Sequence, residues 1–412
     1  MAPGAQSRYT RPPRMTFITD QQELDGFCAR LAAEPYITVD TEFMRERTYW
    51  PILCVIQLGG AKEAAAVDAL ADTLDLAPVY DLMRAPDVLK VFHAARQDVE
   101  IFFHRGGAVP APIFDTQVAG MVCGFGDSVA YETLVQKLAR GSLDKSARFT
   151  DWSARPLTER QITYALADVT HLRKIYEKLS ARLAETGRES WLNAEMAVLT
   201  DPETYRLEPE EAWRRLKART RSPRFLAILR EVAAWREREA QSRDVPRQRI
   251  LRDEALMEIA AHAPVNETML ERTRGVSSGF GASRGGQALL EAVRRGAGLP
   301  EDKAPTLPKK EPPPRGLGPV IELLKVLLKM RCEADDVAQK LVASSADLEA
   351  IAADDEADVP ALKGWRREIF GEDALALKHG RIALTVSGKT LRVVEADEVD
   401  EAEPAGRKKP AA

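Results

Sequence analysis

The stretch YITVDTEF, residues 36–43, decides the fold of the first part of the chain. Most of its side chains are apolar or β-branched, which is typical of a buried strand. Asp40 and Glu42 lie two positions apart, so both carboxylates point to the same face of that strand. Two neighbouring acids on an apolar strand repel each other, which raises a pKa unless a cation compensates them. Most isolated Asp-x-Glu pairs lie at the end of a strand, where both acids simply reach solvent. The pair alone therefore does not predict a metal site.

The sequence on both sides of this strand alternates between strand and helix patterns, which predicts an α/β domain over residues 16–205. The expected strands after it are LCVIQLG (53–59), AAAVDAL (64–70) and VLKVFHA (88–94). Helices are expected at 19–33, 77–85 and 97–107, the last one ending in glycine. Residues 158–185 read as one long amphipathic helix with Thr158 as its N-cap.

Two further acids and a tyrosine strengthen the metal hypothesis. Asp98 follows a short strand and opens a helix, where negative charge is tolerated. Asp168 lies four residues after Tyr164, so both share one face of the long helix. Alone, Asp98 would be an ordinary helix-start carboxylate and Tyr164 a core aromatic. Together with Asp40 and Glu42, the acids form the oxygen-rich set that two hard divalent cations, Mg²⁺ or Mn²⁺, require.

Five segments carry a resemblance to a known family. VDTEFMRERTYWPILCVIQL (39–58), VFHAARQDVEIF (91–102), FDTQVAG (114–120), LDKSARFTDWSARPLTERQ (143–161) and YALADV (164–169) resemble the DEDDy 3′→5′ exonucleases, in particular the ribonuclease D branch. The resemblance implies a ribonuclease-H-like fold and two metal ions. It also implies release of nucleoside 5′-monophosphates from a free 3′ end.

The same resemblance implies roles for the five residues. Asp40 would bridge both metals, Glu42 and Asp168 would hold the metal on the nucleophile side, and Asp98 would support the other. Tyr164 would orient the attacking water. With an ordinary pKa near about 10, the tyrosine is better suited to hydrogen bonding than to acting as a strong base.

Four other residues of this region are candidates for nucleic-acid contact. Phe43 could wedge against the terminal base or pack in the core. His93 could contact the 3′-terminal nucleotide, or it could be a histidine at a strand end whose hydrogen bonds are made within the fold. Lys145 and Arg155 flank Trp152 and could meet phosphates, although a solvated loop explains them almost as well.

The middle of the chain predicts a helical domain over residues 206–296, in which Lys and Arg outnumber Asp and Glu. AWREREAQSRDVPRQRILRDEALMEIA (234–260) and LERTRGVSSGFGASRGGQALLEAV (270–293) resemble the HRDC domain, a small helical bundle that binds nucleic acid. Arg243, Arg247 and Arg249 are candidates for phosphate contact, although most arginines on a helix surface only solvate it. The glycine-rich GFGASRGG lacks a βαβ context, so we read it as a turn between helices.

The remaining segments complete the expected organisation. We expect an extension without fixed structure at 1–15, a Pro-rich linker at 297–315, a diverged second HRDC-like domain at 316–395, and a disordered tail at 396–412. The fold class is thus a ribonuclease-H-like α/β exonuclease domain followed by one or two all-α HRDC-like domains. RIALTVSGKTLRVVEA (381–396) predicts a terminal hairpin.

Composition limits the setting of the protein. The four cysteines form no Cys-x-x-Cys pair, which argues against a zinc site and a disulfide framework. No stretch approaches the roughly 20 apolar residues that span a bilayer, and the polar N-terminus lacks the apolar part of a signal peptide. We therefore expect a cytoplasmic protein that makes no membrane contact and acts as a monomer.

Three functions remain open at this point. The first is an exoribonuclease that trims the 3′ trailers of transfer RNA precursors and similar structured RNAs. The second keeps the same site but acts on DNA in repair, because contacts to the 2′-hydroxyl cannot be read from a sequence. The third is a non-catalytic module that binds RNA, which the presence of all five motif residues argues against.

Overall fold

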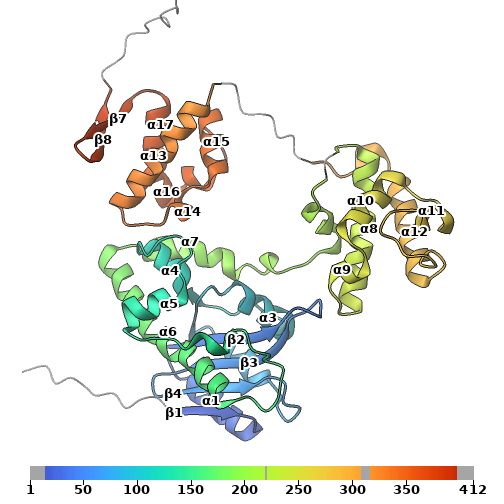
Figure 1. The fold of residues 1–412 in the computed structure, drawn as a ribbon. Coiled ribbons are helices and arrows are strands. Elements are labelled where there is room, and N and C mark those ends of the chain that lie inside the picture. Colours follow the sequence, from blue (N-terminus) through green and yellow to red (C-terminus); the bar gives the residue numbers. More distant parts are fainter. Residues whose placement is uncertain (1–13, 219, 308–315, 397–412) are drawn as a thin grey trace, which may run out of the picture.

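The computed structural model describes residues 14–218, 220–307 and 316–396, apart from the side chain of Lys145. Their buried side chains form separate apolar cores, seen as three bodies in Figure 1: a sheet-containing unit, a first helical unit after it, and a second helical unit at the C-terminal end. Except for residues 14, 15 and 396, the predicted N-terminal extension and tail lie outside the described residues, as do residues 308–315 of the predicted linker.

The sheet-containing unit is built on a mixed six-stranded sheet with the order β1-β4-β3-β2-β5-β6. Pairs β2–β3 and β3–β4 are antiparallel, whereas β1–β4, β2–β5 and β5–β6 are parallel. The strands are β1 (Arg14–Ile18), β2 (Tyr36–Met44), β3 (Ile52–Gly59), β4 (Glu63–Asp68), β5 (Leu89–Phe92) and β6 (Ile113–Asp115). The predicted α/β class is confirmed.

Helices pack on both faces of this sheet (Figure 1). Thr158 and Gln161 form a capping box that begins α6, the longest helix, which contacts β2, β3 and β4. The helical segments are α1 (Gln21–Leu31), α2 (Ala77–Arg84), α3 (Arg96–Gly106), α4 (Thr116–Val122), α5 (Tyr131–Leu134), η1 (Val135–Ala139), η2 (Lys145–Ala147), α6 (Glu159–Thr186), α7 (Glu189–Thr200) and η3 (Pro202–Thr204).

The pairing of β2 with β3 contains an irregularity at the end of the acidic segment of β2. Asp40 lies opposite Gln57 and Glu42 opposite Val55, but the register then shifts so that the residue after Glu42 pairs with Leu53. Cys54 is therefore an extra residue on β3, which is the arrangement of a β-bulge. Bulges bend a strand and turn its side chains, and this one lies directly after the second acid.

The first helical unit packs α8 and α12 against each other around a core that includes Trp213 and Leu289. Gly296 permits this approach, because a Cβ there would lie 2.5 Å from the Cα of Ile228. Its segments are η4 (Pro209–Arg215), α8 (Pro223–Ser242), α9 (Arg247–Ile250), α10 (Asp253–His262), α11 (Glu267–Glu271), α12 (Arg284–Ala297) and η5 (Glu301–Lys303). Residues 209–215 form a 3₁₀-helix.

The second helical unit ends in the predicted hairpin, whose turn contains Gly388 at φ +64°. Its segments are α13 (Gly318–Ala334), α14 (Gln339–Val342), α15 (Ser345–Ala353), η6 (Pro360–Leu362), α16 (Gly364–Arg366), η7 (Arg367–Gly371), α17 (Glu372–Lys378), β7 (Ile382–Ser387) and β8 (Thr390–Glu395). Among all the described helices, none is long and apolar enough to cross a membrane.

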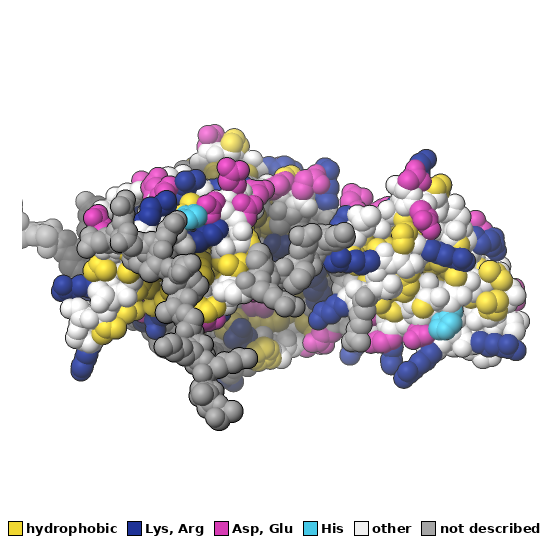
Figure 2. Space-filling model, turned by 90° about the horizontal axis from the view of Figure 1, so that it is seen from above, with side chains coloured by type: hydrophobic (Ala, Val, Ile, Leu, Met, Phe, Trp, Pro, Cys, Tyr) yellow, Lys and Arg dark blue, Asp and Glu magenta, His cyan; other side chains and the backbone are white. Residues whose placement is uncertain are grey.

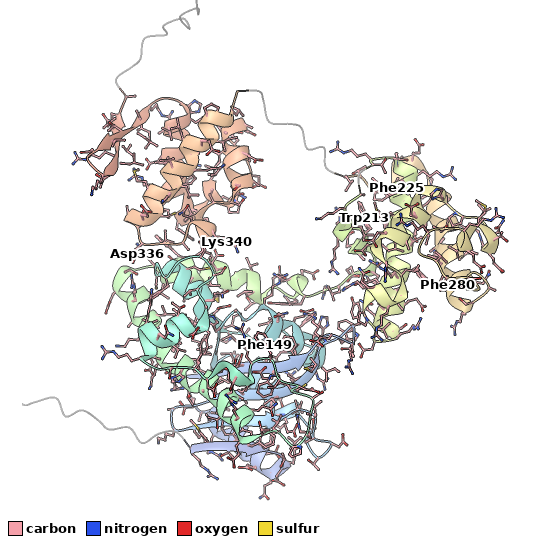
Figure 3. The ribbon with its side chains drawn as sticks, in the orientation of Figure 1. Phe149, Trp213, Phe225, Phe280, Asp336 and Lys340 are labelled. Atoms are coloured by element: carbon pink, nitrogen blue, oxygen red, sulfur yellow. The ribbon has the colours of Figure 1, made fainter. Side chains whose placement is uncertain are left out.

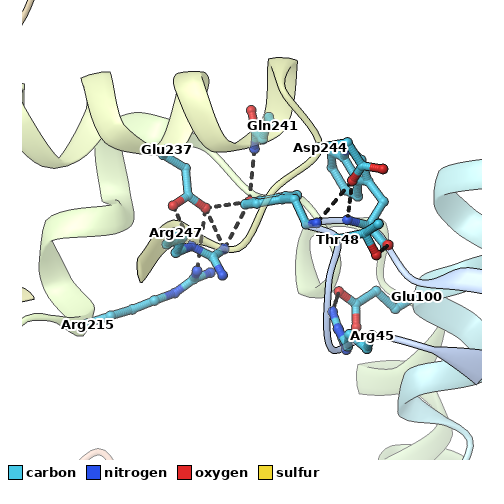
Figure 4. Close-up of polar contacts among 10 residues, drawn as sticks. Arg45, Thr48, Glu100, Arg215, Glu237, Gln241, Asp244 and Arg247 are labelled. Atoms are coloured by element: carbon cyan, nitrogen blue, oxygen red, sulfur yellow. Dashed lines mark hydrogen bonds and ion pairs between the residues drawn. The ribbon is translucent and has the colours of Figure 1, made fainter. Parts of the chain in front are cut away.

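Each helical unit contacts the sheet-containing unit through a junction that includes hydrogen bonds, and the second junction also stacks Trp191 on Trp365. At the first, Tyr49 of the β2–β3 connection reaches the buried Glu237 of α8 (Figure 4). At the second, the Ala338 amide donates to the Met121 carbonyl at 2.9 Å. Asp336 and Lys340, labelled in Figure 3, lie on the segment that makes this second junction.

Candidate functional site

Three of the predicted carboxylates come together between β2 and α6. The ligand oxygens of Asp40, Glu42 and Asp168 all lie within 4.8 Å of one another. The hydroxyl of Thr38 donates to the carbonyl of Val169 at 2.8 Å, which fixes α6 to β2 beside these acids. Two distant segments thus present three oxygen ligands to one point, as a hard cation requires.

The carboxylates lie where like charges repel. Burial, followed by the charges of the other acids, raises the pKa of Asp40 well above its ordinary value. Burial and then the charge of Asp168 raise the pKa of Glu42 to about 9, and burial raises the pKa of Asp168 to about 7. A cation among these oxygens would favour the charged carboxylates and so oppose all three shifts. The donor set therefore fits divalent metal ions.

The fourth acid, Asp98, lies next to this group but outside it. It is buried in the first turn of α3 and accepts a hydrogen bond from the hydroxyl of Thr41, the residue between the two acids of β2. Burial raises the pKa of Asp98 to about 7. Its charge also contributes to the raised pKa of Asp40.

A pocket of about 460 Å³ opens beside the acids. Tyr164 lines it, with its ring 6.1 Å from that of Trp152. Burial and then the charge of Asp168 raise the pKa of Tyr164, so the hydroxyl stays protonated and can donate a hydrogen bond. The pocket is also lined by Asp40, His93, Tyr131, Arg148 and Asp168, among others.

His93 lies deep in this pocket. Its Nδ1 is 3.0 Å from Oγ1 of Thr116, while its Nε2 is buried and has no hydrogen-bond partner within the described residues. Burial lowers the pKa of His93, which favours the neutral ring. Phe43, by contrast, packs against the larger apolar core of the unit, as the core alternative for this residue expected.

The structure gives two of the predicted phosphate-binding arginines other partners. Arg155 donates to Asp68 at 2.8 and 2.6 Å and to the Cys54 carbonyl at 2.8 Å, so its guanidinium is committed inside the fold. Arg247 donates to Glu237 at 2.6 and 2.5 Å. Phosphate contact by either residue stays a prediction, and it would have to compete with these partners. Each guanidinium compensates a buried carboxylate, which costs less than leaving that carboxylate unpaired.

The remaining candidates are less constrained. Arg243 and Arg249 are exposed beside the Asp244–Pro246 turn, and no hydrogen bond of either side chain is seen among the described residues. The side chain of Lys145 lies outside the described part of the structure. On the face shown in Figure 2, Lys and Arg side chains are interspersed with Asp and Glu, without a continuous basic patch over the described residues.

Sequence reasoning missed three residues of the site. The hydroxyl of Tyr131 donates to the Asp168 carbonyl, and Arg148 lines the pocket. Gln57, opposite Asp40, is fully buried with an amide that finds no partner within the described residues. Only Arg148 carried a signal, because it lies in the basic and aromatic segment that drew attention to Lys145.

Comparisons with known proteins agree with this geometry. A family model described as a 3′-5′ exonuclease matches residues 15–184, and an HRDC domain model matches residues 225–293. Ribonuclease D of Granulibacter bethesdensis is 54% identical over 390 residues, covering 94% of this chain and 98% of the relative. Ribonuclease D of Acidiphilium cryptum is 55% identical over 386 residues, with 93% and 98% covered.

A solved structure extends the similarity to three dimensions. The crystal structure of Escherichia coli RNase D, described as an exoribonuclease involved in structured RNA processing, matches with a TM-score of 0.75 and 31% identity. The match covers 90% of this chain and 99% of that one.

Proposed function

The chain belongs to the ribonuclease D family and is a 3′→5′ exoribonuclease. From this premise we propose that it releases nucleoside 5′-monophosphates one at a time from RNA 3′ ends. Two divalent metal ions would assist each release. The observation that carries the proposal is the meeting of Asp40, Glu42 and Asp168 within 4.8 Å beside a pocket. Mg²⁺ and Mn²⁺ are the cations that such an oxygen set favours.

Four carboxylates would hold the metals. Asp40 is central, because the charges of the other three contribute to its raised pKa. Glu42 and Asp168 complete one site with it, and Asp98 supports the second from α3. When bound, the two ions supply a water activated for attack and stabilise the charge on the leaving 3′ oxygen.

The chain's own residues orient the reactants. The Tyr164 hydroxyl, protonated at neutral pH, positions the attacking water by hydrogen bonding. The pocket receives the 3′-terminal nucleotide, and His93 is one of the residues that line it. Arg148 brings a positive charge to the same pocket, which favours a phosphate there.

We further propose that the substrates are structured RNAs with free 3′ ends, such as transfer RNA precursors. The description of the Escherichia coli relative as an enzyme of structured RNA processing supports this class. The HRDC-like unit adds the kind of helical surface that binds a phosphate backbone. A DNA substrate is the weaker alternative, since the relatives described above are ribonucleases.

One assay tests the function. The purified protein is given 3′-extended RNA and the matched DNA, with Mg²⁺, with Mn²⁺, or with EDTA, and products are separated as mononucleotides. We expect 5′-monophosphates from RNA that require the cation. The Asp40→Asn variant should release mononucleotides at least about 10²-fold more slowly, whereas Glu46→Gln, which changes an exposed acid near the same strand, should behave as wild type. Absence of 5′-mononucleotides from RNA with either metal would refute the proposal, and equal rates on DNA would refute the RNA preference.

A further inference from the structure

Phe149 is the most exposed large apolar side chain among the described residues. It lies on the loop between η2 and α6, and 91% of its surface is accessible. Its neighbours along the loop behave differently, because Ala147 and Trp152 are almost completely buried at 1% and 2%. The chain therefore places this one aromatic ring in solvent between two points of attachment.

The loop around Phe149 is held by hydrogen bonds on both sides. The hydroxyl of Thr150 donates to the Ala147 carbonyl at 2.7 Å and accepts from the side chain of Gln161, at the start of α6, at 3.1 Å. Farther along, Arg155 ties the loop to Asp68 of β4. The exposure of the ring is thus imposed by an anchored backbone and is not a consequence of a loose segment.

Arg148 connects this ring to the pocket. It lines the pocket together with Asp40, Tyr164 and other residues, and its guanidinium carbon lies 5.2 Å from the centroid of the Phe149 ring. Within the described residues its guanidinium makes neither a hydrogen bond nor an ion pair. A cation over one ring face leaves the other face free and keeps a phosphate-binding group at the rim.

No other part of the described chain covers the ring. Figure 3 draws Phe149 on the sheet-containing unit, apart from Asp336 and Lys340 at one junction and from Trp213, Phe225 and Phe280 in the first helical unit. A partner that covers the ring would therefore come from outside the described residues.

We propose that Phe149 is a stacking platform for the base of the nucleotide that precedes the 3′-terminal one, and that Arg148 contacts the phosphate joining the two. This inference rests on the proposed function, because it assumes that the terminal nucleotide enters the pocket. The base before it then lies at the rim, where Phe149 stands. Stacking on an aromatic side chain accepts every base, since each base has a π face.

Binding of short single-stranded RNA tests the stacking. Measurements use the Asp40→Asn background, so that RNA is not consumed, and compare intact RNA with RNA that lacks the base at the position before the last. We expect Phe149→Ala to raise the dissociation constant for intact RNA about tenfold and for the abasic RNA less than about twofold. Phe149→Trp should retain the affinity. Val265→Ala, which truncates another exposed apolar side chain, serves as the matched control.

The contribution of Arg148 is separated by its salt dependence. Arg148→Ala should weaken the binding of both RNAs equally. It should also reduce the salt dependence of binding by the amount expected for about one phosphate contact. If Phe149→Ala lowers the affinity for intact and abasic RNA equally, or lowers neither affinity, the stacking platform is overturned. An Arg148→Ala variant with the wild-type salt dependence would overturn the phosphate contact. If either of these results is obtained while the wild-type protein still releases mononucleotides, the proposed function stands. If the wild-type protein releases none, the proposed function itself is refuted.

Discussion

Replacing Glu237 with Gln removes a buried charge from the junction between α8 and the β2–β3 connection. Only 2% of the Glu237 side chain is exposed. Its carboxylate accepts from the Tyr49 hydroxyl at 2.5 Å and from Arg247 at 2.5 and 2.6 Å, and Arg215 approaches to 3.7 Å (Figure 4). The substitution keeps the size of the side chain and changes only its charge and one hydrogen-bonding group.

The expected cost follows from the burial of this pair. Breaking a buried ion pair costs about 3–5 kcal/mol, because the remaining charge is left without compensation. The Arg247 side chain is 34% exposed, so solvent screens the pair and we expect the lower end of the range, about 3 kcal/mol. That is a large part of the roughly 5–15 kcal/mol that stabilises a typical domain.

Hydrogen–deuterium exchange of the α8 amides measures the effect. A loss of about 3 kcal/mol should speed their exchange through unfolding roughly a hundredfold. The control is Glu239→Gln, two residues along α8, because its carboxylate has no hydrogen bond or ion pair among the described residues. Exchange in Glu237→Gln within about fivefold of the control would refute the reasoning.

The pH dependence of the same variant gives the sign of the interaction. Burial raises the pKa of Glu237, but the hydrogen bonds from Arg247 and Tyr49, with the charges of Arg247 and Arg215, hold it below its ordinary value. The ionised carboxylate thus stabilises the folded state above the ordinary pKa of about 4.5, and this stabilisation is lost as the pH falls through the lowered value. The difference in the free energy of unfolding between wild type and variant should be at its maximum at pH 7 and should shrink below about pH 4.5.

The other predictions concern the acids, the tyrosine and the second junction. Asp40→Asn should lower mononucleotide release about 10²- to 10³-fold and raise the melting temperature in EDTA, because repulsion among buried carboxylates is reduced; a lower melting temperature would contradict this. Tyr164→Phe should lower kcat on RNA about 10²-fold, and an unchanged kcat would exclude a role for the hydroxyl. Gly124 and Gly126 both have left-handed φ, at +78° and +92°, but only at Gly124 would a Cβ clash, 2.0 Å from Oδ1 of Asp336. In thermal unfolding, the Gly124→Ala variant should therefore be less stable than the Gly126→Ala variant. The latter carries only the strain of an alanine at positive φ, about 1–2 kcal/mol. Equal stability of the two variants would contradict the contact between Gly124 and Asp336.

Most of the sheet could be predicted from the sequence, because β2 to β5 are runs of apolar residues with clear ends. The two edge strands were missed. In β1 only Ile18 is buried, so RMTFI lacks the continuous apolar pattern of a central strand. β6 has three residues, too few to show any alternation.

The carboxylates were predictable because each lies in a local pattern that indicates an element and a face. The ion pairs could not be predicted where a side chain finds its partner far along the chain. Arg155 pairs with Asp68 across 87 residues, and Arg247 meets Tyr49 across 198 residues. Their sequence context shows only a positive charge, which an internal ion pair and a phosphate contact use equally well. Spacing alone cannot separate these two uses.

The β2–β3 connection has a consequence for how members of this family can be recombined. It continues the strand that carries Asp40 and Glu42, places Tyr49 on the buried Glu237, and returns as β3. A hybrid that took its first helical unit from a relative would keep a matched junction if residues 45–51 came from the same parent. The segment to be exchanged therefore crosses the boundary between the two folded bodies and includes part of the hairpin formed by β2 and β3.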